Sequence, residues 1–340
     1  MTTETSVSPI YFDYLDQIAN LELKNKPAQQ GGTAIRYRIA REQQGDTALC
    51  GLISQSFLKQ ESKKPVILVT GTGNPVWLPE GETDGPSGVA ILARAFASIG
   101  IPSCILAEER FLPGVLASVR AGGMPILSEE SWLKRTNGAW CQPFPTGAKA
   151  ALPFIESLLS RPHGWSGVFF IEKPGPSVEG CFHNSSGVPK DPEWVGHAHM
   201  LADAARQQGV LTVGVGDGGN EIGFGVIREA LYHAHPQRFK CQCGCETGLL
   251  DGTIVDYLFP CSVSNWGAYA LAAALALHQG RSHILPQWPE IEASIRAPLD
   301  HGAFDGYTGM AMPSVDGVSL KANRSVYHLF EEVVQLASFG

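Results

Sequence analysis

The residues of this chain best suited to chemistry are acidic residues that stand beside glycines. Residues 216–225 read GDGGNEIGFG and carry Asp217, Asn220 and Glu221. Glycine permits positive φ angles and lets the backbone approach a ligand closely, whereas glutamate is not a residue that turns prefer. Backbone N–H groups before a helix can also hold an anion. We therefore expect this segment to form a ligand-facing loop.

Three further loops carry polar residues of the same kind. Glu82 and Asp84 lie in GETDGPSG, Glu172 ends an apolar run, and Asn265 precedes a helical pattern. Carboxylates held together can bind a divalent cation through their oxygens, or serve as an acid and a base. Aspartate or asparagine before a helix is also a common cap or turn former, so that structural alternative stays open for each residue taken singly.

The elements that would position these loops are short β-rich runs that alternate with helical patterns. The expected strands are residues 66–70, 103–107, 167–172, 210–215 and 254–259, and the expected helices are residues 87–98, 112–121, 149–159, 193–208, 222–235 and 266–278. Continuous hydrophobicity in such runs is typical of strands buried on both faces. The pattern predicts an α/β fold, a three-layer α/β/α arrangement with a mostly parallel sheet. Ligands bind beyond the carboxyl ends of such strands, so the loops should converge on one edge.

The beginning of the chain has a different pattern. Helices are expected over residues 10–23 and 48–60, joined by a polar turn around Gln30-Gly31-Gly32. We interpret residues 1–62 as an N-terminal helical segment that packs on the sheet or caps it, and residues 63–335 as a catalytic core. Because no linker is long or polar enough to require a boundary, we expect a single α/β domain over residues 1–340.

Bulk properties narrow the classes of function. The 340 residues are 44% hydrophobic and 17% charged, with a net charge of −8, so there is no basic surface for nucleic acid or an anionic membrane. The N-terminus lacks the pattern of a signal peptide and no apolar run is long enough for a membrane span, which favours a cytoplasmic protein acting on small molecules. A P-loop ending and a Gly-x-Ser-x-Gly elbow are both absent from the sequence. A homo-oligomer is compatible with the sequence, which does not fix the oligomeric state.

Eight cysteines are scattered along the chain without the pattern of a secreted disulfide framework. Cys241, Cys243 and Cys245 cluster in CQCGC, with His233 and His235 upstream, which suggests zinc. The two-residue gap usual between chelating cysteines is missing, however, and no second pair follows. We therefore expect a glycine-rich loop with reduced thiols there, and the sequence does not assign these three cysteines a role.

Taken together, these loops resemble the D-glutamate cyclase family, in particular its C-terminal domain. The resemblance rests on GETDGPSG (81–88), IEKPGP with EGCFHN (171–184), GDGGNEIGFG (216–225), SNWGAYALAAAL (264–275) and HGAFDGYTG with SVDGVSL (301–320). The motifs occur in the family's order and span roughly residues 66 to 320. The segment around residues 241–252 departs from the family's cysteine pattern.

The resemblance implies that the α-amino group of D-glutamate attacks its own γ-carboxyl group, which releases water and forms 5-oxo-D-proline. The substrate would be an acidic amino acid, and Mg²⁺ or Mn²⁺ is expected because an acidic pocket would otherwise repel two substrate carboxylates. The residues that we assign to this chemistry are, as catalytic groups, Glu172, Asp217 and Glu221; as metal ligands, Glu82, Asp84, Asp217 and Glu221; and as substrate-binding groups, Gly218, Gly219, Asn220, Asn184, Asn265 and Asp305. Lys173 and His183 are expected to be ordinary surface residues.

Two other functions remain compatible with the sequence. One keeps the site and changes the substrate, giving a metal-dependent lactam or amide hydrolase or a cyclase of another acidic amino acid. The other is a non-catalytic protein that binds an amino acid or nucleotide. A binding protein would need the glycine loops but has no need of several clustered carboxylates.

Overall fold

The computed structural model describes residues 7–24, 32–60, 63–235, 237 and 239–337. Its centre is a six-stranded sheet in the order β3-β2-β1-β4-β7-β8, in which every neighbouring pair is parallel. The strands are β1 (Val66–Val69), β2 (Ser103–Glu108), β3 (Ala139–Phe144), β4 (Gly167–Ile171), β7 (Leu211–Gly216) and β8 (Tyr257–Pro260). The predicted α/β fold with a parallel sheet is therefore confirmed.

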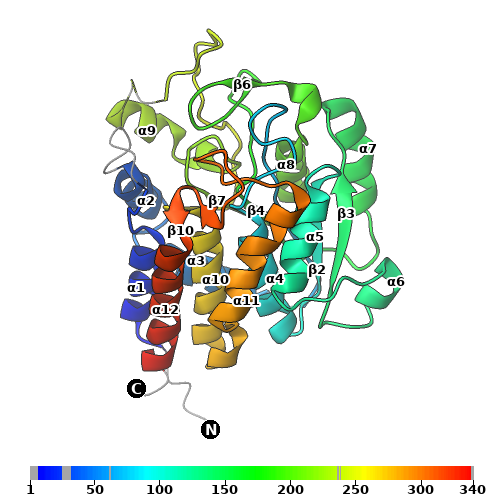
Figure 1. Ribbon diagram of the computed structural model, residues 1–340, viewed down its shortest axis with the longest axis vertical. Helices are drawn as coiled ribbons and strands as arrows, with labels where there is room; N and C mark the ends of the chain where they lie inside the picture. The colour runs from blue at the N-terminus through cyan, green and yellow to red at the C-terminus, as the bar shows by residue number, and fades with distance from the viewer. Residues whose placement is uncertain (1–6, 25–31, 61–62, 236, 238, 338–340) are drawn as a thin grey trace.

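Helices flank this sheet on both faces (Figure 1). The helices that follow the first central strand are α4 (Pro86–Ser98), α5 (Leu112–Ala121), α6 (Glu129–Trp132), α7 (Ala148–Leu159), α8 (Ala198–Gln207), α9 (Arg228–Ala234), α10 (Ser264–Gln279), α11 (Trp288–Arg296) and α12 (Leu320–Ala337). Helix α4 follows β1 and α5 follows β2, whereas α7 and α8 precede and follow β4. Along the chain, strands are added outward from β1 toward β3 on one side and from β4 toward β8 on the other. Right-handed connections in these opposite directions place α4 and α5 on the face opposite α7 and α8.

The core lies where α4 and α10 meet the central strands. Every residue of β1 and β4 is buried, and α10 is buried from Ser264 to Leu277. The many alanines of α10 allow its backbone to approach α4 closely. Phe57, Phe96 and Phe169 pack ring against ring with centroids 4.9 to 5.8 Å apart.

The N-terminal segment forms helices α1 (Pro9–Ala19), α2 (Gly32–Gln43) and α3 (Leu49–Leu58). The first and third were expected, and both pack against α10. Helix α2 was not predicted. Of the expected polar turn, Gln30 and Gly31 lie outside the described residues, and Gly32 already begins α2. None of the described helices is long and apolar enough to cross a membrane.

Several predicted boundaries were wrong. The helix expected over residues 193–208 begins only at Ala198, after a short 3-10 turn at Pro192–Trp194. The helix expected over residues 222–235 is the shorter α9, because the chain from residue 222 first makes a 3-10 turn at Phe224–Val226. The last strand begins at Tyr257 rather than residue 254. Strand β3 and helices α11 and α12 were not anticipated.

Candidate active site

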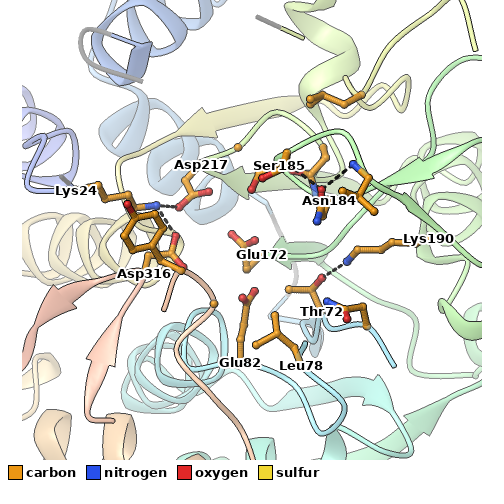
Figure 2. Close-up of a pocket in the computed structure, with 18 of the residues that line it drawn as sticks. Lys24, Thr72, Leu78, Glu82, Glu172, Asn184, Ser185, Lys190, Asp217 and Asp316 are labelled. Carbon is orange, nitrogen blue, oxygen red and sulfur yellow. Dashed lines mark hydrogen bonds and ion pairs between the residues drawn. The ribbon is translucent and has the colours of Figure 1, made fainter. Parts of the chain in front are cut away.

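A cavity of about 1270 Å³ opens beyond the carboxyl ends of the central strands. In this strand order the chain changes direction between β1 and β4, which is the place where open α/β sheets bind ligands. Figure 2 shows the carboxylates of Glu82, Glu172 and Asp217 around the open middle of the cavity. Of the predicted site residues, those that line the cavity are Glu82, Glu172, Asn184, Asp217, Gly218 and Asn220.

Glu172 follows β4 directly and has a left-handed backbone, with φ of 51°. Such a conformation is strained for a residue with a side chain and is found disproportionately at functional sites. The side chain is 7% exposed, and its Oε2 accepts a hydrogen bond of 2.5 Å from the Ser264 hydroxyl group. Burial, reinforced by the charges of Asp217 and Glu221, raises the pKa of Glu172 well above its usual range. A buried carboxylate with a raised pKa is suited to general acid–base catalysis.

Asp84 joins the loop after β1 to the start of α10. Its carboxylate accepts hydrogen bonds from the backbone N–H groups of Ser264 at 2.9 Å, Asn265 at 2.8 Å and Gly85 at 3.0 Å. A carboxylate has about four acceptor positions, so one position on Oδ2 is left for a ligand. Burial, followed by the charge of Asp316, raises the pKa of Asp84 to about 7.

Gly85 allows the loop that carries Asp84 to pass close to Glu172. Its φ is +98°, and a Cβ atom there would lie 2.3 Å from the hydroxyl oxygen of Thr70 and 3.2 Å from the Cβ of Glu172. Only glycine therefore allows the loop that carries Asp84 to turn beside Glu172.

Asp217 directly follows β7 and is paired with a lysine from the N-terminal segment. The Lys24 ammonium contacts the carboxylates of both Asp217 and Asp316 (Figure 2). Burial raises the pKa of Asp217 well above its usual range although Lys24 opposes this shift. Burial alone would lower the pKa of Lys24, but the charges of Asp217 and Asp316 raise it well above its usual value. Lys24 is thus a fixed positive charge at the cavity wall.

The glycine loop after β7 is folded back on its own glutamate. Glu221 accepts hydrogen bonds from the backbone N–H groups of Gly218 at 3.2 Å and Gly219 at 2.8 Å. Burial raises the pKa of Glu221, which is only 1% exposed and does not line the cavity. By contrast, Asn220 lines the cavity, and its buried Oδ1 has no hydrogen-bond partner in the described part of the chain. Asn220 therefore has an amide oxygen available to accept a hydrogen bond from a ligand.

Glu82 and Lys190 form the opposite side of the cavity. Burial, followed by the charges of Asp316 and Asp84, raises the pKa of Glu82 well above its usual range. Burial lowers the pKa of Lys190 although Glu82 opposes the shift, and the Lys190 ammonium donates a hydrogen bond of 2.7 Å to the Thr72 hydroxyl group. An acidic group and a basic group therefore face the same space (Figure 2).

Three of the predicted substrate-binding residues have their side-chain oxygens occupied by the protein. Asn265 accepts from the N–H groups of Gly85 and Gly88 at 3.0 and 2.6 Å. Asp305 accepts four hydrogen bonds from the loop at residues 307–317. Asn184 lines the cavity, but its Oδ1 accepts from two N–H groups of its own hairpin. In the described structure these three side chains hold loops in place.

Three carboxylates lie close enough together to bind one metal ion, whereas the sequence suggested four ligands. Oxygen atoms of Asp84, Glu172 and Asp217 lie within 4.8 Å of one another, and all three residues are buried. Glu82 and Glu221, which we expected among the ligands, are outside this group. Hard carboxylate oxygens at this separation fit Mg²⁺ or Mn²⁺.

The structure corrects two expectations and adds residues that we missed. Lys173 and His183 were expected on the surface, but both are fully buried, and Lys173 pairs with the buried Glu108. The charged residues at the cavity that sequence reasoning missed include Lys24, Arg36, Lys190 and Asp316. Of these residues, only Asp316 could have been found from the sequence, because Asp-Gly between two short β-like runs predicts a tight hairpin. In the structure this hairpin is the turn that joins β9 (Ser314–Val315) and β10 (Val318–Ser319).

Comparison of the sequence with known proteins identifies relatives of this chain. Residues 39–329 match the family model described as "D-glutamate cyclase-like, C-terminal". The human protein named "D-glutamate cyclase, mitochondrial" is 24% identical over 295 residues, an alignment that covers 74% of this chain and 43% of the human protein. The chain therefore corresponds to less than half the length of this relative.

Proposed function

Because the chain belongs to the D-glutamate cyclase-like family, we propose that it is a hydro-lyase that converts D-glutamate to 5-oxo-D-proline and water. The observation that carries the proposal is the buried group of Asp84, Glu172 and Asp217 at the carboxyl ends of β1, β4 and β7, with lysines on either side. A site that only bound an amino acid would have no need to bury so many carboxylates together.

The reaction requires two protons to move from nitrogen to oxygen. The substrate ammonium group loses a proton, its nitrogen forms a bond to the γ-carbon, and one γ-oxygen leaves as water after the two nitrogen protons have been transferred. Glu172 is the proposed base, since its raised pKa suits both uptake and release of a proton. Glu82, which burial keeps protonated to a higher pH than usual, is the proposed acid for the departing oxygen.

Substrate recognition follows from the charges at the cavity. D-Glutamate carries two carboxylates, and Lys24 and Lys190 are the ammonium groups of the described residues that line the cavity. We assign Lys190 to the γ-carboxylate because it faces Glu82, the proposed acid. Lys24 would partly neutralise the second carboxylate, and the unpartnered Oδ1 of Asn220 would accept a hydrogen bond from the substrate ammonium group. Holding both ends in this way would bring the amine to its own γ-carbon.

A divalent metal fits this scheme at one place. Asp84 and Asp217 would hold it beside Glu172, which this scheme keeps for proton transfer, and Asp84 has one unused acceptor position on Oδ2. A bound Mg²⁺ or Mn²⁺ would polarise the γ-carboxyl group as a Lewis acid. Since Lys24 contacts Asp217, metal and ammonium would compete for that carboxylate. The glycine N–H groups become available to a substrate oxygen only if Glu221 moves, so we assign Glu221 to positioning the loop.

The test is to incubate the purified chain with D-glutamate or L-glutamate, with and without Mg²⁺ or Mn²⁺, and to follow 5-oxoproline by NMR. We expect turnover of D-glutamate that increases with metal. Asp217→Asn should abolish turnover without changing the circular-dichroism spectrum, while Asp300→Asn, a change at an exposed carboxylate, should keep full activity. Absence of D-glutamate turnover by the wild-type chain would refute the proposal.

A second candidate is favoured by the size of the cavity. About 1270 Å³ exceeds the roughly 300–1000 Å³ usual for small-molecule sites, which suits a larger acidic amide or lactam. A short peptide that begins with 5-oxoproline should then be hydrolysed at the lactam faster than 5-oxoproline itself. The expected cytoplasmic location also remains a proposal, since the name of the human relative assigns that protein to mitochondria.

A further inference from the structure

A second cluster of metal-binding side chains lies apart from the carboxylates. It consists of His183 on the short strand β5 (Phe182–His183) and of Cys241, Cys243 and Cys245 in a loop that follows α9. One ligand atom from each of the four residues lies within 4.8 Å of the others. The sequence pointed to His233 and His235 as partners of these cysteines, but neither belongs to the cluster found among the described residues.

The separations within the cluster match those of a tetrahedral zinc centre. His183 Nε2 lies 3.1 Å from Cys243 Sγ and 3.7 Å from Cys245 Sγ, and Cys241 Sγ lies 3.2 Å from Cys245 Sγ and 3.4 Å from Cys243 Sγ. With zinc–sulfur bonds of about 2.3 Å and zinc–nitrogen bonds of about 2.0 Å, tetrahedral ligands are roughly 3.5 to 3.8 Å apart. A small adjustment would therefore admit the ion, and all three cysteines are reduced.

Backbone contacts hold the two segments in this arrangement without the metal. The Gln242 backbone N–H group donates to the Gly187 carbonyl at 2.8 Å, and the Gln242 side-chain amide donates to the Ser186 carbonyl at 3.2 Å. Gly187 has φ of +77°, and a Cβ atom there would lie 2.6 Å from the Lys240 carbonyl oxygen. The cysteine loop is thus docked directly onto the hairpin of residues 182–190.

The histidine of the cluster has the properties of a fixed ligand. His183 is fully buried, and its Nε2 is directed at the sulfurs. Its buried Nδ1 has no hydrogen-bond partner within the described residues. A buried imidazole whose interactions are all with thiols is poorly satisfied without a metal, because sulfur is a weak hydrogen-bond partner.

We propose that His183, Cys241, Cys243 and Cys245 form a structural zinc site of the Cys₃His type. Four protein ligands complete a tetrahedron and leave no position for substrate, which is typical of structural rather than catalytic zinc. The hairpin supplies Ser185 and Lys190 to the cavity wall, and the loop supplies Phe239 and Leu249. The zinc ion therefore links two parts of that wall. This inference does not depend on the reaction that the cavity performs.

The test begins with the metal content of the full chain, purified under reducing conditions without a metal-affinity tag and equilibrated with buffered zinc. We expect one zinc ion per chain. Cys243→Ser and His183→Gln should lose nearly all of it, whereas Cys181→Ser, a matched change two residues before His183 and outside the cluster, should retain it. Asp217→Asn should also retain it, which separates this site from the carboxylates. A wild-type chain without zinc, or equal zinc in Cys243→Ser, would overturn the proposal.

Two further measurements do not require any variant to fold. Replacement of zinc by Co²⁺ should produce thiolate-to-cobalt charge-transfer bands and the strong visible bands of tetrahedral coordination. Removal of the metal should speed hydrogen exchange in residues 182–190 and 239–249 and leave the strands of the central sheet unchanged. Octahedral cobalt spectra would contradict a zinc site. So would a Cys241–Cys245 disulfide that persists when the protein is kept under reducing conditions.

Discussion

At the scale of single residues, Glu172 combines three features that a structural role would not require. Its backbone is left-handed, its carboxylate is buried, and the carboxylates of Asp217 and Glu221 add to the effect of burial on its pKa. We predict that Glu172→Gln lowers kcat by about 10² to 10⁴-fold, the usual contribution of a general acid–base group. The amide retains the shape of the side chain and an acceptor for Ser264, so the unfolding transition should change little. Glu80→Gln, a change at an exposed residue on the loop that also carries Glu82, serves as the control; a similar loss in both variants would argue against a special role for Glu172.

Lys190 tests substrate recognition rather than proton transfer. If its ammonium group holds a substrate carboxylate, Lys190→Gln should raise KM for D-glutamate by roughly 10- to 100-fold, because a hydrogen bond to a charged group contributes about 1.5–3 kcal/mol. Its effect on kcat should be smaller. Lys134→Gln, which alters an exposed lysine on the surface, should leave both constants unchanged. Steady-state kinetics that show a loss of kcat alone would assign Lys190 to the chemical step instead.

The carboxylates were predictable from the sequence because they stand beside glycines at the ends of apolar runs. Glu172 and Asp217 follow buried strands directly, so the parallel sheet brings them together. Lys24 and Lys190 were not predictable, since nothing in their neighbourhood distinguishes them from surface lysines. The location of each is set by long-range packing that brings the N-terminal segment and the small hairpin to the cavity.

At the scale of elements, the contact between α4 and α10 decides where Asp84 meets Ser264. A Cβ atom at Gly88 would lie 2.9 Å from the Ala268 Cβ and 3.0 Å from the Asn265 Oδ1. We predict that Gly88→Ala destabilises the fold by about 1–3 kcal/mol, as overpacking does, although alanine is the better helix former. The free energy of unfolding in urea measures this effect, and activity should fall with it.

Gly114 is the matched control for Gly88, since it lies in α5 and its added Cβ would meet no atom closer than 3.5 Å. Gly114→Ala should be neutral or stabilise the fold by up to about 1 kcal/mol. If both variants proved equally stable, the close approach of α4 and α10 would not be the constraint that we infer.

The elements also show why some of the fold was missed. Strand β3 reads AWCQPF at the edge of the sheet, where a proline and a glutamine are tolerated, so it lacks the continuous hydrophobicity of the central strands. The sequence of α12 does show a helical pattern, because the buried residues Val326, Phe330 and Val333 recur at helical spacing. The weak signal of β3 is a physical limit, whereas α12 was open to prediction.

At the scale of the whole molecule, burying several carboxylates together couples folding to protonation. Burial and the charge of Asp316 raise the pKa of Asp84 to about 7, and burial raises the pKa of Asp16 to about 6. In the unfolded chain an aspartate has a pKa of about 3.9. Between these values the folded chain binds more protons than the unfolded chain, so the free energy of unfolding falls as the pH rises. The stabilisation from Asp84 is complete below roughly pH 4 and is lost as the pH rises through about 7.

We therefore predict that the melting temperature, measured without added Mg²⁺ or Mn²⁺, decreases from about pH 5 to about pH 8, and that Asp84→Asn makes this decrease shallower. Asp300→Asn should keep the wild-type slope, because that residue is exposed. If Asp84, Glu172 and Asp217 bind a divalent metal, protons compete with it for the same oxygens. Added Mg²⁺ should then raise the melting temperature more at about pH 8 than at about pH 5, because binding to the folded state alone stabilises it. Equal stabilisation at both pH values would place the ion elsewhere and remove the carboxylate group as the metal site.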